Sequence, residues 1–168
     1  AVIRQSLVDT LAEFGLESPP ADLVERLLDQ AVPTETLANE HGVDPAAFWR
    51  RREANASTAQ VEAVRRGDKT PYDDAGVLAD IDAPLGLVSN NQAATVEYIC
   101  DRFSFDTAFG TTYGREPSLT GAARKKPNPH YIERAIADIG ATEVLYVGDS
   151  NVDLRAAAAA DVDAAFVR

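Results

Sequence analysis

The chain has 168 residues, of which 45% are hydrophobic and 26% are charged. This length and this balance suit one globular domain, or a domain with a modest insertion, that is large enough to bury a core. A net charge of −11 makes nucleic acids and anionic membranes poor partners, because both repel an acidic protein.

The cysteine content and the apolar runs exclude further classes of protein. The single cysteine, Cys100, excludes an intrachain disulfide and a thiolate metal cluster. No apolar run approaches the length of a membrane span, and no secretory signal is visible. We therefore expect a cytoplasmic protein, either a monomer or a homodimer. The acidic surplus also resembles the composition of proteins adapted to high salt.

The part of the chain before Pro71 has the sequence pattern of helices. Apolar residues recur at helical spacing, Gly15 ends the first stripe, and Asp44 followed by Pro45 is a typical helix start. Helices are expected over residues 2–14, 21–31, 34–41 and 45–66. Four helices with short connections predict a small helical bundle.

After Pro71 the pattern changes to strands that alternate with helices. Strands are expected at 84–88, 105–109, 143–147 and 164–167, helices at 92–103, 129–139 and 152–160, and a long polar loop at 111–126. This alternation predicts βαβ units and a parallel sheet. The expected fold class is therefore α/β, with a Rossmann-like parallel sheet and a small helical bundle.

The segment from Glu143 to Asp153 is the most informative. An apolar run ends at Gly148, and Asp149 and Asp153 follow, four residues apart. Ligands of open α/β sheets bind at the carboxyl ends of the strands, and one helical turn can bring both carboxylates there. Two converging carboxylates suit Mg²⁺, the commonest cation with phosphate substrates. The same residues also fit a plain turn in which Asp149 or Ser150 caps the next helix.

Two other loops carry candidate site residues. Ser89 and Asn90 follow the apolar run at 84–88, where a hydroxyl and the amides that open a helix can donate to an oxyanion. Lys126 precedes Pro127, which restricts the direction in which the lysine leaves the chain. A positioned ammonium can neutralise a phosphoryl group and a nearby carboxylate. Alternatively, Ser89 is a helix N-cap and Lys126 belongs to a solvated turn.

Taken together and in this order, these motifs resemble those of the haloacid dehalogenase superfamily. Ser89 matches the second motif, Lys126 the third, and Asp149 with Asp153 the fourth. The resemblance covers residues 84–168. The preceding helical segment is similar to the cap that the subgroup of phosphoglycolate phosphatase and β-phosphoglucomutase inserts after its first motif.

The resemblance implies a helical cap at residues 4–70 and a catalytic core at 71–168, with residues 1–3 as the remnant of a first strand. It implies a Mg²⁺-dependent phosphohydrolase that acts on a small phosphorylated metabolite, such as phosphoglycolate or a sugar phosphate, through an aspartyl-phosphate.

The same resemblance implies roles for the motif residues. Asp149 and Asp153 would hold Mg²⁺. Ser89, the backbone amides near Asn90, and Lys126 would hold the phosphate oxygens.

The sequence departs from the superfamily at the first motif, Asp-x-Asp-Gly-Thr/Val, which supplies the nucleophilic aspartate and the general acid/base. The motif does not occur: three aspartates lie in predicted helices and two precede the Ser89 strand, namely Asp9, Asp22, Asp29, Asp73 and Asp74. We expect a truncated chain rather than a natural pseudoenzyme.

Three alternatives stay open. A phosphate-binding or regulatory module without catalysis would lack the first motif. A hydrolytic dehalogenase would need no metal, against which the two carboxylates argue. A response-regulator receiver also combines Asp, Ser/Thr and Lys at a sheet edge, but the helical segment and the Lys-Pro context argue against it.

Overall fold

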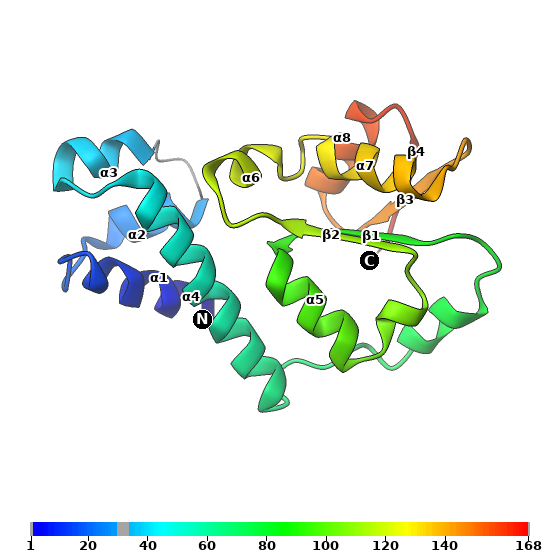
Figure 1. Cartoon of the computed structure of the whole chain (residues 1–168), viewed down its shortest axis with the longest axis horizontal. Helices are drawn as coiled ribbons and strands as arrows, with labels where there is room; N and C mark the ends of the chain where they lie inside the picture. The colour runs from blue at the N-terminus through cyan, green and yellow to red at the C-terminus, as the bar shows by residue number, and fades with distance from the viewer. Residues whose placement is uncertain (1, 30–33, 168) are drawn as a thin grey trace. The chain divides into compact units, whose positions relative to one another are not determined.

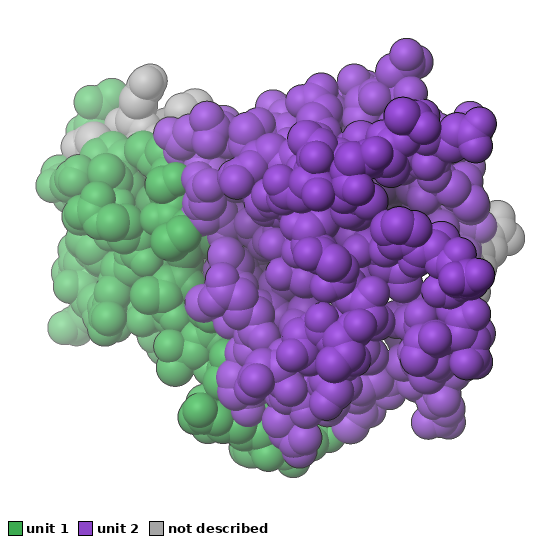
Figure 2. Space-filling view, turned by 45° about the vertical axis from the view of Figure 1, so that its right-hand side comes forward, with its two compact units in different colours: residues 1–69, 117–119 green, residues 70–116, 120–168 purple. Residues whose placement is uncertain are grey.

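The computed structural model describes residues 2–29 and 34–167, which form two compact units (Figures 1 and 2). The first unit comprises residues 1–69 and 117–119, and the second comprises residues 70–116 and 120–168. The assignment of these units to a cap and a catalytic core stays a prediction. Within the described ranges, no helix is both long and apolar enough to cross a membrane.

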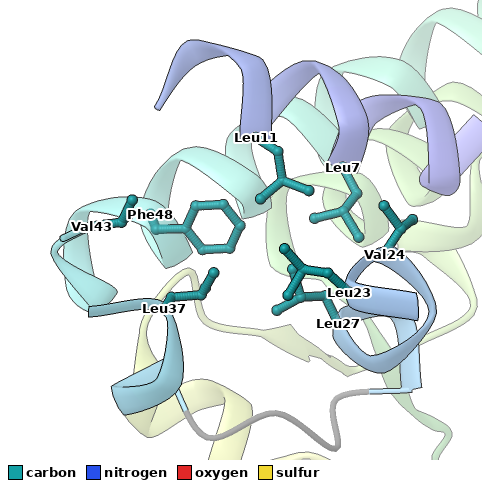
Figure 3. Packing of buried hydrophobic residues seen from close by; sticks show 8 residues of the cluster. All are labelled: Leu7, Leu11, Leu23, Val24, Leu27, Leu37, Val43 and Phe48. Atoms are coloured by element: carbon teal, nitrogen blue, oxygen red, sulfur yellow. The ribbon is translucent and has the colours of Figure 1, made fainter. Parts of the chain in front are cut away.

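The first unit contains the four predicted helices. They are α1 (Val2–Glu13), α2 (Ala21–Asp29), α3 (Thr34–His41) and α4 (Pro45–Arg65). The predicted end of the second helix, at residues 30–31, lies outside the described residues. The core consists of apolar side chains from all four helices and from the turn before α4, as Figure 3 shows: Leu7, Leu11, Leu23, Val24, Leu27, Leu37, Val43 and Phe48. Burial of this shared apolar stripe is what stabilises short helices in water.

The predicted remnant of a first strand is wrong where it is described, because Val2 and Ile3 form the first turn of α1. Ala1 lies outside the described residues. Ile3 belongs to the same helical stripe as Leu7 and Leu11, which are buried in the bundle core, and Val2 precedes it in the same turn. The packing of α1 therefore decides the conformation of these two β-branched residues, against their preference for strands.

Helix α4 begins as the sequence predicts, because the Asp44 carboxylate accepts hydrogen bonds from the backbone amides of Ala46 and Ala47 at 3.3 and 3.2 Å. Pro45 occupies the first turn, where its missing N–H costs no hydrogen bond.

Two arginines of α4 make contacts within the helical unit. Arg51 Nη2 donates to Glu13 Oε1 at 3.0 Å, which joins α4 to α1. The Arg52 guanidinium is buried, lies 4.7 Å from the centre of the Trp49 ring, and pairs with the buried Glu53 at 2.9 Å. These contacts explain both arginines as parts of the bundle.

The second unit alternates strands and helices. Its elements are η1 (Ala75–Asp80), β1 (Gly86–Gln92), α5 (Ala93–Arg102), η2 (Phe105–Thr107), β2 (Thr111–Arg115), α6 (Leu119–Arg124), α7 (His130–Ile139), β3 (Leu145–Gly148), α8 (Asn151–Ala159) and β4 (Asp163–Phe166). Strand β1 pairs with β2 and β3 pairs with β4, both in parallel. The predicted α/β class with parallel strands is therefore confirmed. The four described strands form two sheets of two strands each.

Helices α5 and α7 pack against opposite faces of the β1–β2 sheet (Figure 1). The alternation of side chains along β2 shows this directly. Thr111 and Tyr113 point to α7, where both hydroxyls donate to Asp138. Gly114 points to α5, and a Cβ atom there would lie 2.5 Å from the Cα atom of Ala93. A glycine at this position lets α5 lie directly on the strand.

The β3–β4 sheet is covered differently on its two faces. Tyr146 and Gly148 point to α8, and a Cβ atom at Gly148 would lie 2.4 Å from Asp153 Cβ. On the opposite face, Leu145 and Val147 are 61% and 55% exposed. Parallel sheets usually have both faces covered, so this apolar face is unusual for its type.

The prediction of a strand over residues 105–109 is wrong, because the chain forms the 3₁₀ helix η2 there. Ser104 takes a left-handed conformation with φ 58°, which reverses the chain after α5. The Thr107 hydroxyl donates to the Ser104 carbonyl at 2.9 Å. Phe105 is thereby placed beside Phe103, with ring centres 6.2 Å apart. This local turn and ring contact outweigh the β-propensity of the phenylalanines.

The prediction of a polar loop over residues 111–126 is also wrong, since this range contains β2 and α6. The polar composition of β2 hid the strand, which is fixed by parallel pairing with β1, with Thr111 opposite Gly86 and Tyr113 opposite Val88. Strand β1 in turn extends through Gln92, with an irregular register after Val88.

The close contact of α5 with β2 predicts that Gly114→Ala destabilises the protein. A methyl group here meets backbone atoms that cannot rotate away, and overpacking of this kind costs about 1–3 kcal/mol. Urea unfolding measures the effect. Gly76→Ala is the matched control, because a Cβ atom there has no neighbour within 4 Å. Equal unfolding midpoints for the two variants would contradict the described packing.

Candidate active site

The Lys126 side chain lies at the centre of the candidate site. Its ammonium donates three hydrogen bonds, to the Val88 carbonyl at 3.0 Å, the Tyr146 hydroxyl at 2.8 Å and Asp153 Oδ1 at 2.6 Å. The side chains of Lys126 and Asp153 are only 11% and 7% exposed. A charge buried to this extent requires partners that replace its water. The ammonium has them, and it joins β1, β3 and α8.

The backbone of Lys126 is fixed by Asn90. Lys126 N donates to Asn90 Oδ1 at 2.8 Å, and Asn90 Nδ2 donates to the Lys126 carbonyl at 3.0 Å. The peptide bond from Lys126 to Pro127 is cis. The Asn90 carboxamide therefore clamps the lysine-bearing segment to β1. This contact places Asn90 at the site as a residue that positions Lys126.

Ser89 follows the carbonyl group that Lys126 binds. Its hydroxyl oxygen accepts a hydrogen bond from the backbone N–H of Asn91 at 3.1 Å. A hydroxyl can accept and donate at the same time, so Ser89 can still donate to an oxyanion. It lies where the regular pairing of β1 with β2 ends after Val88.

Asp153 uses both of its carboxylate oxygens. Oδ1 accepts from Lys126, and Oδ2 accepts from the Ser150 backbone N–H at 3.1 Å and from the Ser150 hydroxyl. Ser150 Oγ accepts from the Asp153 backbone N–H at 3.3 Å, which completes a capping box at the start of α8. Ser150 is therefore the N-cap of α8, as one of the two sequence interpretations predicts, and Asp153 both completes the capping box and pairs with Lys126. Gly148 leaves the space that Asp153 occupies.

These contacts shift the pKa values of the three side chains. Burial alone would lower the pKa of Lys126, but its bonds to Asp153 and Tyr146 outweigh burial and raise it. Burial alone would raise the pKa of Asp153, but its bonds from Lys126 and Ser150 outweigh burial and lower it. The pKa of Tyr146 is raised, mainly by burial. Lys126 and Asp153 are therefore held as an ion pair beside a neutral phenol.

Asp149 follows β3 directly and is exposed to solvent. Across residues 2–29 and 34–167, no group of three or more acidic, histidine or cysteine side chains is arranged to hold a metal ion. Mg²⁺, however, commonly binds through one or two carboxylates, several waters and the phosphate of a substrate. Asp149 fits this role. Asp153 fits it directly only if one of its oxygens gives up a protein donor, and otherwise through a water.

The structure thus joins Lys126 to Asp153 and to Asn90, with Ser89 next along β1. Tyr146 is the site residue that sequence reasoning missed. The alternation of β3 carried the signal, because a residue two positions before Gly148 faces the same side of the strand as that glycine. Of the aspartates weighed as nucleophiles, Asp9 and Asp22 lie in α1 and α2, and Asp73 and Asp74 precede η1. The side chain of Asp29 lies outside the described residues.

The arrangement can bind an anion beside a carboxylate. The Lys126 ammonium binds the carbonyl next to Ser89 on β1, and the start of α8 and the exposed Asp149 follow the carboxyl end of β3, the usual ligand position in open α/β sheets.

The solved structures that are similar to this chain include two hydrolases of related fold. One is a protein provisionally named a phosphoglycolate phosphatase, from Lactobacillus plantarum, with a TM-score of 0.60, 19% identity, and coverage of 95% of this chain and 75% of the other. The second is a HAD-superfamily hydrolase of subfamily IA from Geobacter sulfurreducens PCA, with a TM-score of 0.52, 19% identity, and coverage of 96% and 79%. At this identity the likeness concerns the fold.

The comparison with curated proteins gives no match. The family model described as haloacid dehalogenase-like hydrolase matches residues 2–167, which is nearly the whole chain. This match agrees with the order of the serine, lysine and aspartate motifs and with the parallel strands. The chain belongs to the haloacid dehalogenase-like hydrolase family.

Proposed function

We propose that the chain provides the phosphate- and metal-binding site of a Mg²⁺-dependent phosphohydrolase that acts on a small phosphomonoester. The observation that carries this proposal is the largely buried Lys126 ammonium, which is held by Val88 of β1 and Tyr146 of β3 and paired with Asp153. The chain belongs to a family of hydrolases. The fixed positive charge of Lys126 suits an anionic substrate such as a phosphate better than a neutral one.

The proposed roles follow from the contacts. Lys126 binds a phosphate oxygen and offsets the negative charge of the transition state. Ser89 donates its hydroxyl proton to a second oxygen. Asn90 holds the Lys126 backbone in position, and its own backbone N–H is the proposed third donor. Asp153 keeps the lysine charged and fixes the start of α8.

Asp149 is the proposed direct ligand of Mg²⁺, with Asp153 acting on the ion through water. When bound, Mg²⁺ supplies charge that offsets the repulsion between carboxylates and phosphate. Asp149 suits this role because it is exposed and directly follows β3, in the turn that leads into α8, which carries Asp153.

Hydrolysis through an aspartyl-phosphate also requires an attacking aspartate at a strand end and a second acid that protonates the leaving oxygen and then activates water. Residues 1–168 do not contain the family's motif for them. The natural protein would have to supply both from sequence outside these residues. A phosphate-binding module without catalysis is the second candidate, because phosphate binding by Lys126 and Ser89 would need no attacking aspartate.

Phosphate binding tests the role of Lys126. The Lys126→Ala variant should bind inorganic phosphate at least about tenfold more weakly than the unmodified chain, because a hydrogen bond from a charged donor is lost. Isothermal titration calorimetry with Mg²⁺ present measures both affinities. Lys125→Ala removes the same charge one residue earlier and should keep most of the affinity. Equal losses in the two variants would contradict a specific role for Lys126.

Hydrolysis of p-nitrophenyl phosphate by the natural gene product tests the role of Asp149. The Asp149→Asn variant should lose Mg²⁺-dependent hydrolysis, because the proposed metal ligand loses its charge. Asp163→Asn is the matched control, since Asp163 lies opposite Leu145 at the other end of the same sheet.

Three results of this assay would contradict parts of the proposal. Undiminished activity of Asp149→Asn would exclude Asp149 as the metal ligand. Activity that persists in a metal chelator, or that removes halide from a haloacid, would favour the dehalogenase. A natural gene product without an Asp-x-Asp after a first strand would favour the binding module.

A further inference from the structure

Lys126 has no hydrogen-bond donor left over in the described structure. An ammonium group has three N–H donors, and the three acceptors of Lys126 are the Val88 carbonyl, the Tyr146 hydroxyl and Asp153 Oδ1. A phosphate oxygen can therefore be bound by Lys126 at full strength only if one of these acceptors is released. Which acceptor leaves is decided by the cost of losing each bond.

Two of the acceptors are costly to release. The bond to Asp153 is the shortest of the three at 2.6 Å and joins opposite charges, which makes it the strongest type. The Val88 carbonyl lies on β1, and the Tyr146 hydroxyl, 3.5 Å from its oxygen, would be only a weak substitute donor, so this partly buried backbone carbonyl is costly to release.

Tyr146 is the acceptor that costs least. Its hydroxyl is neutral, and its oxygen lies 3.3 Å from Asp153 Oδ1 and 3.5 Å from the Val88 carbonyl oxygen. The phenol can donate its proton to Asp153 whether or not it accepts from Lys126. Tyr146 is therefore a neutral group that keeps its hydrogen bond to Asp153 after Lys126 turns away, whereas release of Asp153 by Lys126 would separate opposite charges.

We propose that the Tyr146 hydroxyl is a placeholder for a phosphate oxygen: it accepts the third proton of the Lys126 ammonium until a phosphate oxygen replaces it. Tyr146 is thus a positioning residue that acts through Lys126 and keeps the ammonium in one place before the anion binds. This inference rests on the proposed function, because it assumes that Lys126 binds phosphate.

The placeholder predicts the direction of a mutational effect. Tyr146→Phe removes the bond from Lys126, which exists only in the anion-free state, whereas the bond to Asp153 is lost from both states alike; inorganic phosphate should therefore bind about three- to tenfold more tightly. A tyrosine that merely supports the structure would give unchanged or weaker binding when its hydroxyl is removed. Tyr113→Phe is the matched control, because its hydroxyl also donates to a carboxylate, that of Asp138, between β2 and α7.

Calorimetry with inorganic phosphate compares the unmodified chain with both variants. Tighter binding by Tyr146→Phe with no change in Tyr113→Phe supports the placeholder, whereas unchanged or weaker binding by Tyr146→Phe overturns it. If the unmodified chain binds no phosphate, the proposed function fails and the placeholder fails with it. That result is seen without any variant, so the two failures are distinguishable.

A second measurement needs no substitution at Tyr146. Addition of inorganic phosphate to the ¹³C-tyrosine-labelled chain should move the NMR resonance of Tyr146 Cζ and leave that of Tyr113 Cζ in place. Assignment of the two resonances uses the phenylalanine variants. A Tyr146 resonance that stays fixed while phosphate binds would overturn the placeholder.

Discussion

The hydrogen bonds of one ammonium group connect the parts of the α/β unit that carry the candidate chemistry. Lys126 binds a carbonyl of β1, a hydroxyl of β3 and a carboxylate of α8. Among the strands that the structure describes, β1 pairs with β2 and β3 with β4, so backbone pairing does not join the two sheets. Breaking a buried ion pair by removing one partner is strongly destabilising, which makes the contact of Lys126 with Asp153 hard to break.

This constraint explains why several polar residues have the contacts they have. Asn90 fixes the Lys126 backbone from β1. Ser150 donates a hydrogen bond to the second oxygen of Asp153. The carboxylate that pairs with the lysine therefore also caps the start of α8. Gly148 leaves room for Asp153 to approach the strand. Stability and the proposed phosphate binding thus depend on the same few hydrogen bonds. In the proposed mechanism, the bond from Lys126 to the neutral Tyr146 hydroxyl is the one that a phosphate oxygen replaces.

Much of this arrangement could be predicted from the sequence. Helical periodicity located α1 to α4, and the motifs around Ser89, Lys126 and Asp153 identified residues that lie together. Strand β2 was missed because its residues are polar and its conformation depends on pairing with β1, a contact distant in sequence. The turn at Ser104 was missed because a left-handed residue other than glycine leaves no clear sequence signal.

The hydrogen-bond partners of each site side chain could not be predicted from the sequence. That Asp153 would both cap α8 and pair with Lys126 follows from three-dimensional packing, as does the contact of Tyr146 with both. The most direct test of the account is a crystal structure of the chain grown with inorganic phosphate and Mg²⁺. The account predicts a phosphate oxygen within hydrogen-bond distance of Lys126 Nζ and of Ser89 Oγ, with Asp149 as a ligand of the cation. Phosphate bound elsewhere, with Lys126 still hydrogen-bonded to Tyr146, would contradict it.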